Sequence, residues 1–169
     1  MKAKYIVFEG IDCCGKTTLI DNVVSAFNLR TVPDHYPRRN FKSYHNAEEI
    51  LQELADHRYK SGLHFVDRYW PSTIVYQRIN YSLQEMQERL PIDALIILSI
   101  DQETWTKRIK QRKDDWFTPD KIKDFKEYDD LYRDLAKQDV TFPILHLDIK
   151  NVPTHEQLKS VYNIVSNLL

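Results

Sequence analysis

The stretch YIVFEGIDCCGKTTLI, residues 5–20, decides the fold because it gathers two of the chain's three glycines and both of its cysteines between two apolar runs. Gly10 and Gly15 stand at the two ends of the intervening turn. A glycine at each end of a turn lets the backbone curl until several N–H groups point at one centre, and phosphate oxygens are the usual occupants of such a turn. The stretch therefore predicts a phosphate-binding loop.

The segment from Gly10 to Thr17 matches the phosphate-loop pattern G-x-x-x-x-G-K-[ST]. Its surroundings agree with the pattern, since residues 5–8 form an apolar run that is typical of a strand. After the loop, a buried helix face is indicated by apolar residues four apart, at Leu19, Val23 and Phe27. Strand, loop and helix in this order are the context that the mechanism of the pattern requires.

The loop predicts a site for the phosphates of ATP. We expect the backbone N–H groups of residues 13–18 to surround the β-phosphate, Lys16 to reach the β- and γ-oxygens, and the Thr17 hydroxyl to ligate Mg²⁺. The predicted ATP-binding residues are Gly10, Asp12, Cys13, Cys14, Gly15, Lys16, Thr17 and Thr18. ATP is thus the expected phosphate donor, and Mg²⁺ the expected metal.

The bulk composition limits the classes of protein that fit. A chain of 169 residues, 42% of them hydrophobic, predicts a single domain over residues 1–169. The 24 Lys and Arg are balanced by 25 Asp and Glu, so no overall field attracts nucleic acid or membranes. No run resembles a signal peptide or a membrane span, which predicts a cytoplasmic protein. The adjacent Cys13 and Cys14 suit neither a disulfide nor a zinc site, and we interpret them as small turn residues.

Strands alternate with helices along the chain. Apolar runs predict strands at residues 5–8, within 29–42, and at 62–69, 93–100 and 143–149. Helices are predicted after the loop, at 46–60 and 102–113, after a break at Thr118 and Pro119, and around Leu158–Val165. This alternation predicts an α/β fold of three layers, in which a parallel sheet of about five strands has helices on both faces.

Several segments resemble, in order, the landmarks of thymidylate kinases: FEGIDCCGKTT, YPRR, DRYWPSTIVYQ, LPIDALIILSID and the basic stretch that begins at Arg108. The resemblance extends over nearly the whole chain. It implies a P-loop kinase fold, with an acceptor-binding segment at about 34–60 and a lid at about 108–120. It also implies transfer of the γ-phosphate of Mg·ATP to a deoxynucleoside 5′-monophosphate, with dTMP or a related pyrimidine nucleotide as the acceptor.

Asp67 and Arg68 follow a predicted strand, at the edge of the sheet where open α/β folds bind ligands. An acid at this place can hold Mg²⁺ directly or through water, together with Thr17. An arginine offers paired N–H donors to a phosphate. The alternative is an ordinary ion pair at the surface. The resemblance implies that Arg68 grips the acceptor phosphate and that Asp67 acts near the metal or the attacking phosphate.

The resemblance also implies an acceptor pocket. Its predicted residues are Asp12, Tyr36, Arg38, Arg39, Tyr44, Arg68, Thr73 and Tyr76. Asp12 would reach the deoxyribose 3′-hydroxyl, and either Arg38 or Arg39 would bind the acceptor phosphate. Tyr76 would pack against the sugar or, alternatively, belong to the core. The segment before Asp67 is shorter than in the family and lacks an arginine that holds the base, which leaves the choice of base open. The family uses this segment in a homodimer, so the oligomeric state also stays open.

A basic stretch before the break at Thr118 indicates a lid. Phosphoryl transfer spreads negative charge over the transferred oxygens, and cations that close over them stabilise it. Some thymidylate kinases carry an arginine for this purpose within the phosphate loop, where this chain has Cys13, so the lid would supply the charge. A solvated helix end is the alternative. The predicted catalytic residues are Lys16, Asp67, Arg68, Arg108, Arg112 and Lys113.

Two other functions fit the phosphate loop. A deoxynucleoside kinase would need a carboxylate base after the second strand, where Asp34 is the candidate. A non-catalytic module that senses ATP needs no second phosphate site, and the arginines on the acceptor side argue against it. In each case the expected partners are small-molecule nucleotides or nucleosides.

Overall fold

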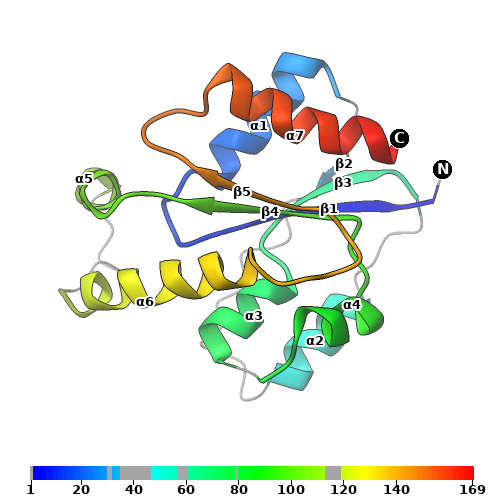
Figure 1. Cartoon of the computed structure of the whole chain (residues 1–169), viewed down its shortest axis with the longest axis horizontal. Helices are drawn as coiled ribbons and strands as arrows, with labels where there is room; N and C mark the ends of the chain where they lie inside the picture. The colour runs from blue at the N-terminus through cyan, green and yellow to red at the C-terminus, as the bar shows by residue number, and fades with distance from the viewer. Residues whose placement is uncertain (1, 30–31, 35–46, 57–60, 79, 113–118) are drawn as a thin grey trace.

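The computed structural model describes residues 2–29, 32–34, 47–56, 61–78, 80–112 and 119–169. At its centre lies a sheet in the order β2-β3-β1-β4-β5, in which every neighbouring pair is parallel (Figure 1). The strands are β1 Lys4–Glu9, β2 Val32–Asp34, β3 Leu63–Asp67, β4 Ala94–Ser99 and β5 Ile144–Asp148. Four of them have five or six residues, whereas the edge strand β2 has three. The parallel sheet of about five strands predicted from the sequence is confirmed.

Helices lie on both sides of the sheet. On one side, α1 Lys16–Phe27 packs against α7 His155–Leu168. The opposite side carries α2 Ala47–Asp56, α3 Trp70–Gln77, α4 Leu83–Arg89 and α6 Pro119–Leu135. Helix α5 Gln102–Arg112 lies beyond the carboxyl ends of the strands (Figure 1). The predicted three-layer α/β architecture is therefore confirmed.

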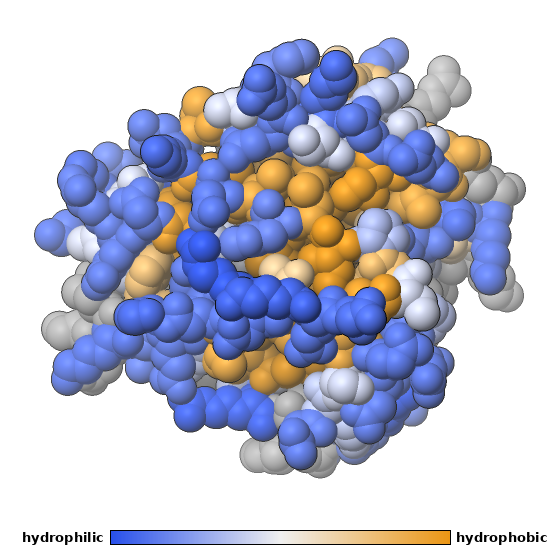
Figure 2. Space-filling view, in the orientation of Figure 1, coloured by the Kyte–Doolittle hydropathy of each residue, from blue (hydrophilic) through white to orange (hydrophobic). Residues whose placement is uncertain are grey.

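One face of the molecule is largely hydrophilic. In Figure 2 hydrophilic side chains cover most of the face in view, and hydrophobic residues show through between the helices above the sheet and α6 below it. Among the described residues, the exposed large hydrophobic side chains are Val152 and Leu169. None of the described helices combines the length and the apolar character needed to cross a bilayer.

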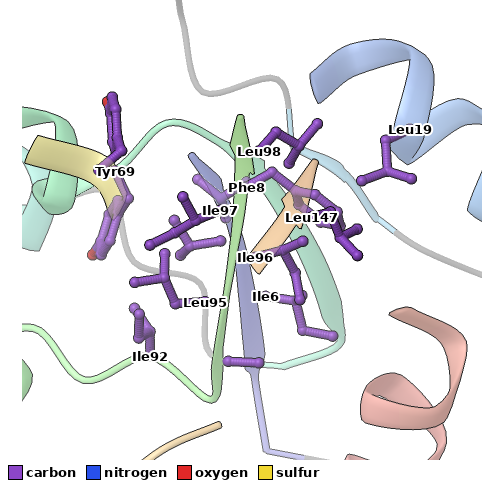
Figure 3. Packing of buried hydrophobic residues seen from close by; sticks show 14 of the residues in the cluster. Ile6, Phe8, Leu19, Tyr69, Ile92, Leu95, Ile96, Ile97, Leu98 and Leu147 are labelled. Atoms are coloured by element: carbon purple, nitrogen blue, oxygen red, sulfur yellow. The ribbon is translucent and has the colours of Figure 1, made fainter. Parts of the chain in front are cut away.

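Strand β4 is buried on both faces, as a central parallel strand should be. All six of its residues are buried. Leu95 and Ile97 point to the side of Tyr69, while Ile96 and Leu98 point to the side of Leu19 on α1 (Figure 3). The alternation of side chains along the strand thus joins both helical layers to one core.

Two helices, α3 and α4, are absent from the sequence-based description of the chain. Most of the side chains of α3 are buried, so it shows no amphipathic stripe by which a helix is recognised. Helix α4 is short, but it begins with a capping box in which Ser82 and Glu85 exchange hydrogen bonds. The helix predicted over 46–60 is observed as α2, and residues 57–60 lie outside the described residues.

The register of β1 and β3 brings two loops together. Phe8 pairs with Asp67, and the backbone N–H of Arg68 donates to the Phe8 carbonyl oxygen at 3.0 Å. The chain therefore leaves both strands at the same edge, with Gly10 after one and Arg68 after the other. The carboxyl edge of a parallel sheet is where folds of this class bind ligands.

Candidate active site

The phosphate loop connects β1 to α1, and its conformation requires both glycines. Gly10 has a φ of 137° and Gly15 a φ of 106°, and residues other than glycine rarely adopt this backbone conformation. A Cβ atom on Gly10 would also overlap the carbonyl oxygen of Leu98 on β4. The loop can therefore lie this close to the sheet only with glycine at position 10.

The N-terminus of α1 is open to an anion. Its N-cap is Gly15, which has no side chain that could cap the helix, and no acidic residue lies in the first turn. By contrast, α4 and α7 both begin with complete capping boxes. Unpaired N–H groups at a helix start, following a glycine-rich turn, form a suitable site for phosphate. Thr18 is exposed in this first turn.

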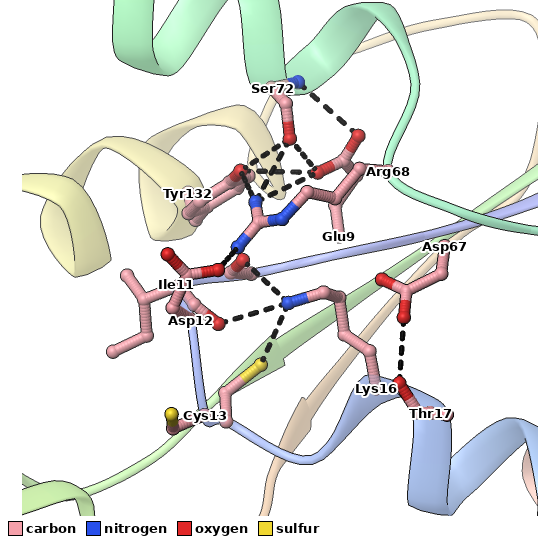
Figure 4. Close-up of polar contacts among 12 residues, drawn as sticks. Glu9, Ile11, Asp12, Cys13, Lys16, Thr17, Asp67, Arg68, Ser72 and Tyr132 are labelled. Atoms are coloured by element: carbon pink, nitrogen blue, oxygen red, sulfur yellow. Dashed lines mark hydrogen bonds and ion pairs between the residues drawn. The ribbon is translucent and has the colours of Figure 1, made fainter. Parts of the chain in front are cut away.

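Lys16 is folded back over the loop. Its ammonium group donates to the carbonyl oxygens of Gly10 at 3.1 Å and Ile11 at 3.0 Å, and approaches the Cys14 sulfur at 3.8 Å (Figure 4). The residue is only 6% exposed. The buried ammonium group of Lys16 is thus held at the loop by backbone carbonyl oxygens.

Thr17 and Asp67 lie side by side, as the metal prediction requires. The Thr17 hydroxyl donates to Asp67 Oδ2 at 2.8 Å (Figure 4). One hydroxyl and one carboxylate oxygen at the edge of a phosphate site match the protein ligands that Mg²⁺ takes in such sites, since phosphate oxygens and water fill its other positions. The two residues therefore fit the expected metal.

Arg68 makes several contacts within the site. Its Nη1 donates to Ser72 Oγ at 3.0 Å and to the Tyr132 hydroxyl at 3.1 Å, and its Nη2 donates to Asp12 Oδ1 at 2.6 Å (Figure 4). The guanidinium also lies over the ring of Tyr76, 5.1 Å from its centroid. Arg68 has a φ of 75°, and these contacts hold it in this unusual backbone conformation.

An electrostatic interaction links Asp12 of the phosphate loop to Arg68. Burial acts to raise the pKa of Asp12, but Arg68 and Lys16 outweigh it and hold that pKa below its ordinary value. Asp12 is therefore ionised at neutral pH. The site contains a carboxylate that already neutralises part of the charge of Arg68.

Side chains of helix α5 donate hydrogen bonds to the phosphate loop. Trp105 Nε1 donates to the carbonyl oxygen of Asp12 at 2.8 Å. Arg108 Nη1 donates to the carbonyl oxygens of Cys13 and Cys14, both at 3.0 Å, and its Nη2 donates to that of Asn151. Arg112 Nη1 approaches the Cys13 sulfur at 3.1 Å. Two of the predicted lid cations, on α5, thus contact the loop, and Lys113 lies outside the described residues.

The predicted acceptor residues are placed in part. Thr73 is fully buried on α3, and its hydroxyl has no hydrogen-bond partner within the described structure. Tyr76 is half-buried beside Arg68 and packs against Tyr128 and Tyr132, so it joins the site to the core. The remaining predicted residues lie outside the described residues: Tyr36, Arg38, Arg39 and Tyr44.

The sequence-based reading missed Glu9, Ser72 and Tyr132, the partners of Arg68 on its buried side. A signal for Glu9 was present, because alternation along β1 turns this carboxylate inward in a strand with apolar neighbours. Tyr132 recurs with Phe125, Tyr128 and Leu135 at spacings of three and four residues, a pattern that indicates the apolar face of a helix and nothing more. Its hydroxyl carried no signal, since the contact joins residues far apart in the chain.

No family model and no curated protein sequence matches the chain. Solved structures match its fold. A deoxyadenosine kinase from M. mycoides, with dCMP and dCDP bound, is 14% identical with a TM-score of 0.64, over 98% of this chain and 100% of that one. The YorR protein of Bacillus subtilis, in complex with phosphorylated GDP, is 19% identical with a TM-score of 0.60, over 96% of both chains.

A thymidylate kinase from Ehrlichia chaffeensis is 20% identical with a TM-score of 0.55, over 100% of both chains. The chain therefore has the fold of the P-loop nucleotide kinases. Thymidylate kinase is one of several enzymes that share this fold, and the resemblance noted in the sequence is supported at this coarser level.

Proposed function

We propose that the protein is a nucleoside monophosphate kinase. It would transfer the γ-phosphate of Mg·ATP to a deoxynucleoside 5′-monophosphate, with dTMP or a related pyrimidine nucleotide as the acceptor. The observation that carries the proposal is the guanidinium of Arg68, which contacts Asp12 of the phosphate loop at 2.6 Å. A cation at this distance from the donor site can bind a second phosphate and hold it in line with the first.

On the donor side, the open start of α1 and Lys16 would bind the phosphates of ATP. Lys16 Nζ would exchange the carbonyl oxygens of Gly10 and Ile11 for phosphate oxygens. Thr17 and Asp67 would hold Mg²⁺, which neutralises charge on the transferred phosphate when it is bound. Positioning and charge neutralisation account for this chemistry, and no covalent nucleophile on the protein is needed.

On the acceptor side, Thr73 and Tyr76 are the described candidates for contact with the nucleoside. No described residue makes a hydrogen bond with the buried Thr73 hydroxyl, and the edge of a base would supply a partner. Tyr76 lies against Arg68, the proposed phosphate ligand, which is consistent with a position beside the sugar. The identity of the base is proposed only from the resemblance to thymidylate kinases.

A deoxynucleoside kinase is the second candidate. It is favoured by the likeness of the fold to that of a deoxyadenosine kinase. Asp34, the proposed base of that reaction, ends β2 at the same edge of the sheet as Asp67.

The two candidates are separated by ADP formation from Mg·ATP with deoxynucleoside 5′-monophosphates and, in parallel, with the corresponding deoxynucleosides. We expect turnover with a pyrimidine monophosphate and little with its nucleoside. Higher kcat/KM for the nucleoside would replace the proposal with the second candidate. An absence of ADP formation above the solvent control for every acceptor would contradict both. The Lys16→Ala variant, purified identically, controls for contaminating kinases.

A further inference from the structure

A buried carboxylate lies beneath the site. Glu9 is the last residue of β1 and is 0% exposed. A carboxylate removed from water is costly unless hydrogen bonds and opposite charge compensate for the lost hydration. Burial raises the pKa of Glu9 above its ordinary value, and the nearby Arg68 guanidinium opposes that effect. The hydrogen-bond partners of Glu9 therefore have to compensate for the burial of its carboxylate.

Four donors surround the carboxylate. Oε1 accepts from the backbone N–H groups of Tyr69 at 2.7 Å and Ser72 at 3.2 Å. Oε2 accepts from Ser72 Oγ at 2.6 Å and from the Tyr132 hydroxyl at 3.1 Å (Figure 4). An ionised carboxylate satisfies all of these contacts because it only accepts hydrogen bonds. Glu9 thus joins β1 to the start of α3 and to α6.

The two hydroxyls connect Glu9 to Arg68. Arg68 Nη1 lies 3.0 Å from Ser72 Oγ and 3.1 Å from the Tyr132 hydroxyl. Because a guanidinium can only donate, both hydroxyl oxygens accept from Arg68, and their own protons turn to Glu9. Arg68 Nη1 is itself 3.9 Å from Glu9 Oε2. The carboxylate therefore sets the direction of the two hydroxyls, and these in turn hold one edge of the guanidinium.

Holding that edge determines where the other edge points. The guanidinium is planar, so fixing Nη1 between Ser72 and Tyr132 leaves Nη2 facing Asp12 at the mouth of the site. The side chain of Arg68 is 15% exposed, and that of Asp12 is 43% exposed. The buried side of Arg68 is thus anchored, while its other side faces the half-open part of the site.

We infer that Glu9 is a positioning residue, whose buried carboxylate acts through Ser72 and Tyr132 to hold Arg68 in the orientation that binds the acceptor phosphate. The acceptor part of this inference rests on the proposed function. The orientation of Arg68 by Glu9 rests on the contacts alone.

The test uses Glu9→Gln, which keeps the shape of the side chain but replaces one oxygen by an NH₂ group. At the Oε1 position, that group would face two backbone N–H donors. At the Oε2 position, it would force Ser72 and Tyr132 to accept from it while they also accept from Arg68. Either placement disturbs the hold on the guanidinium. Tyr132→Phe removes one link only and serves if Glu9→Gln does not fold.

Steady-state kinetics should separate acceptor from donor binding. We expect Glu9→Gln to raise the KM for the acceptor monophosphate by about tenfold or more, the scale of one hydrogen bond to a charged group, with the KM for ATP unchanged within about twofold. Tyr132→Phe should have a smaller effect in the same direction. Tyr128→Phe is the matched control, since this tyrosine lies one turn earlier on α6 and makes ring contact with Tyr76 without joining the network. An unchanged acceptor KM in folded Glu9→Gln, or equal changes in both KM values, would overturn the inference.

A double-mutant cycle with Arg68→Ala tests whether Glu9 acts through Arg68. In the Arg68→Ala background, Glu9→Gln should add little to the loss, whereas equal effects in both backgrounds would contradict the inference. If the wild-type protein phosphorylates no monophosphate, the proposed function fails. The same double-mutant cycle is then measured by the urea concentration at the midpoint of unfolding. Non-additive midpoint shifts would still support the link between Glu9 and Arg68, and additive shifts would overturn it.

Discussion

Arg68 donates to Asp12 across 2.6 Å, so a residue from the end of β3 is joined to the loop that follows β1. The two strands are neighbours in the sheet, and the contact joins the loops that follow the carboxyl ends of these strands. An incoming phosphate that binds Arg68 has to share it with Asp12 or displace that carboxylate. In the proposed reaction, binding of the acceptor phosphate to Arg68 would therefore be coupled to the position of the phosphate loop through this pair.

The first prediction concerns Arg68→Ala. With Arg68 present, the acceptor monophosphate should exceed its own nucleoside in kcat/KM by at least about a thousandfold, because a site built for a charged group rejects an analogue that lacks it. Arg68→Ala should erase most of this preference by losing the reaction of the monophosphate. The measurement is kcat/KM for both acceptors with both proteins. A preference that survives in Arg68→Ala would assign the acceptor phosphate to another residue.

Lys16→Ala should abolish phosphoryl transfer and leave the fold intact. Its ammonium group contacts the loop itself, at the Gly10 and Ile11 carbonyls and the Cys14 sulfur, rather than a distant element. Removal of one preorganised charge donor costs about 3 to 4 kcal/mol in the transition state, which corresponds to at least a hundredfold in kcat. Circular dichroism and urea unfolding report the fold. Near-normal turnover in Lys16→Ala would contradict the assignment of the donor site.

Arg112→Ala should lower kcat more than it weakens ATP binding, by about 2 to 4 kcal/mol of transition-state stabilisation. Cys13→Arg should partly restore kcat in that variant. The Cys13 sulfur lies 3.1 Å from Arg112 Nη1, so a guanidinium introduced at position 13 starts from the region that Arg112 reaches. Cys13 already has a φ of 64°, and its backbone therefore tolerates a side chain. Absence of any recovery in the double variant would show that the loop cannot aim a charge at the transferred phosphate.

Gly10→Ala should destabilise the protein by about 2 kcal/mol or more, since the new Cβ meets the Leu98 carbonyl oxygen in a strained backbone region. Gly15→Ala is the matched comparison. There the nearest atom is Arg108 Nη1 at 3.2 Å, the end of a side chain that can move. Urea unfolding of both variants is the measurement. A larger loss for Gly15→Ala would contradict the packing of the loop against β4.

The ion pair between Glu48 on α2 and Arg89 on α4 predicts a pH effect. Hydrogen bonds from Arg89, and then from Tyr81, lower the pKa of Glu48 from 4.5 to about 2. A carboxyl whose pKa is lowered by folding contributes stability above pH 4.5, and that contribution is lost as the pH falls toward 2. An NMR titration of the Glu48 carboxyl should show this low midpoint.

Arg89→Met should return the Glu48 midpoint toward its ordinary value. Glu85 is the internal control, because its pKa is lowered by the backbone and side chain of Ser82 and should not respond. An ordinary Glu48 midpoint in the wild type would contradict the ion pair between Glu48 and Arg89.

The sequence by itself determined the local parts of this protein. The strand, loop and helix around Gly10, and the central position of the apolar strand at 93–100, could be predicted because each depends on residues close together in the chain. The pairing of Thr17 with Asp67 was expected from the rule that parallel strands bring their carboxyl ends to one edge.

Only the tertiary structure decided how the charges are arranged within that edge. The sequence indicated Asp12 and Arg68 as separate ligands of the substrate, whereas folding pairs them and buries Glu9 behind the arginine. Tyr132 reaches Glu9 and Arg68 from α6, although it is separated from both by much of the chain. No local pattern encodes such contacts, because they depend on how two helices pack on the sheet and on the cost of leaving a buried charge unpaired.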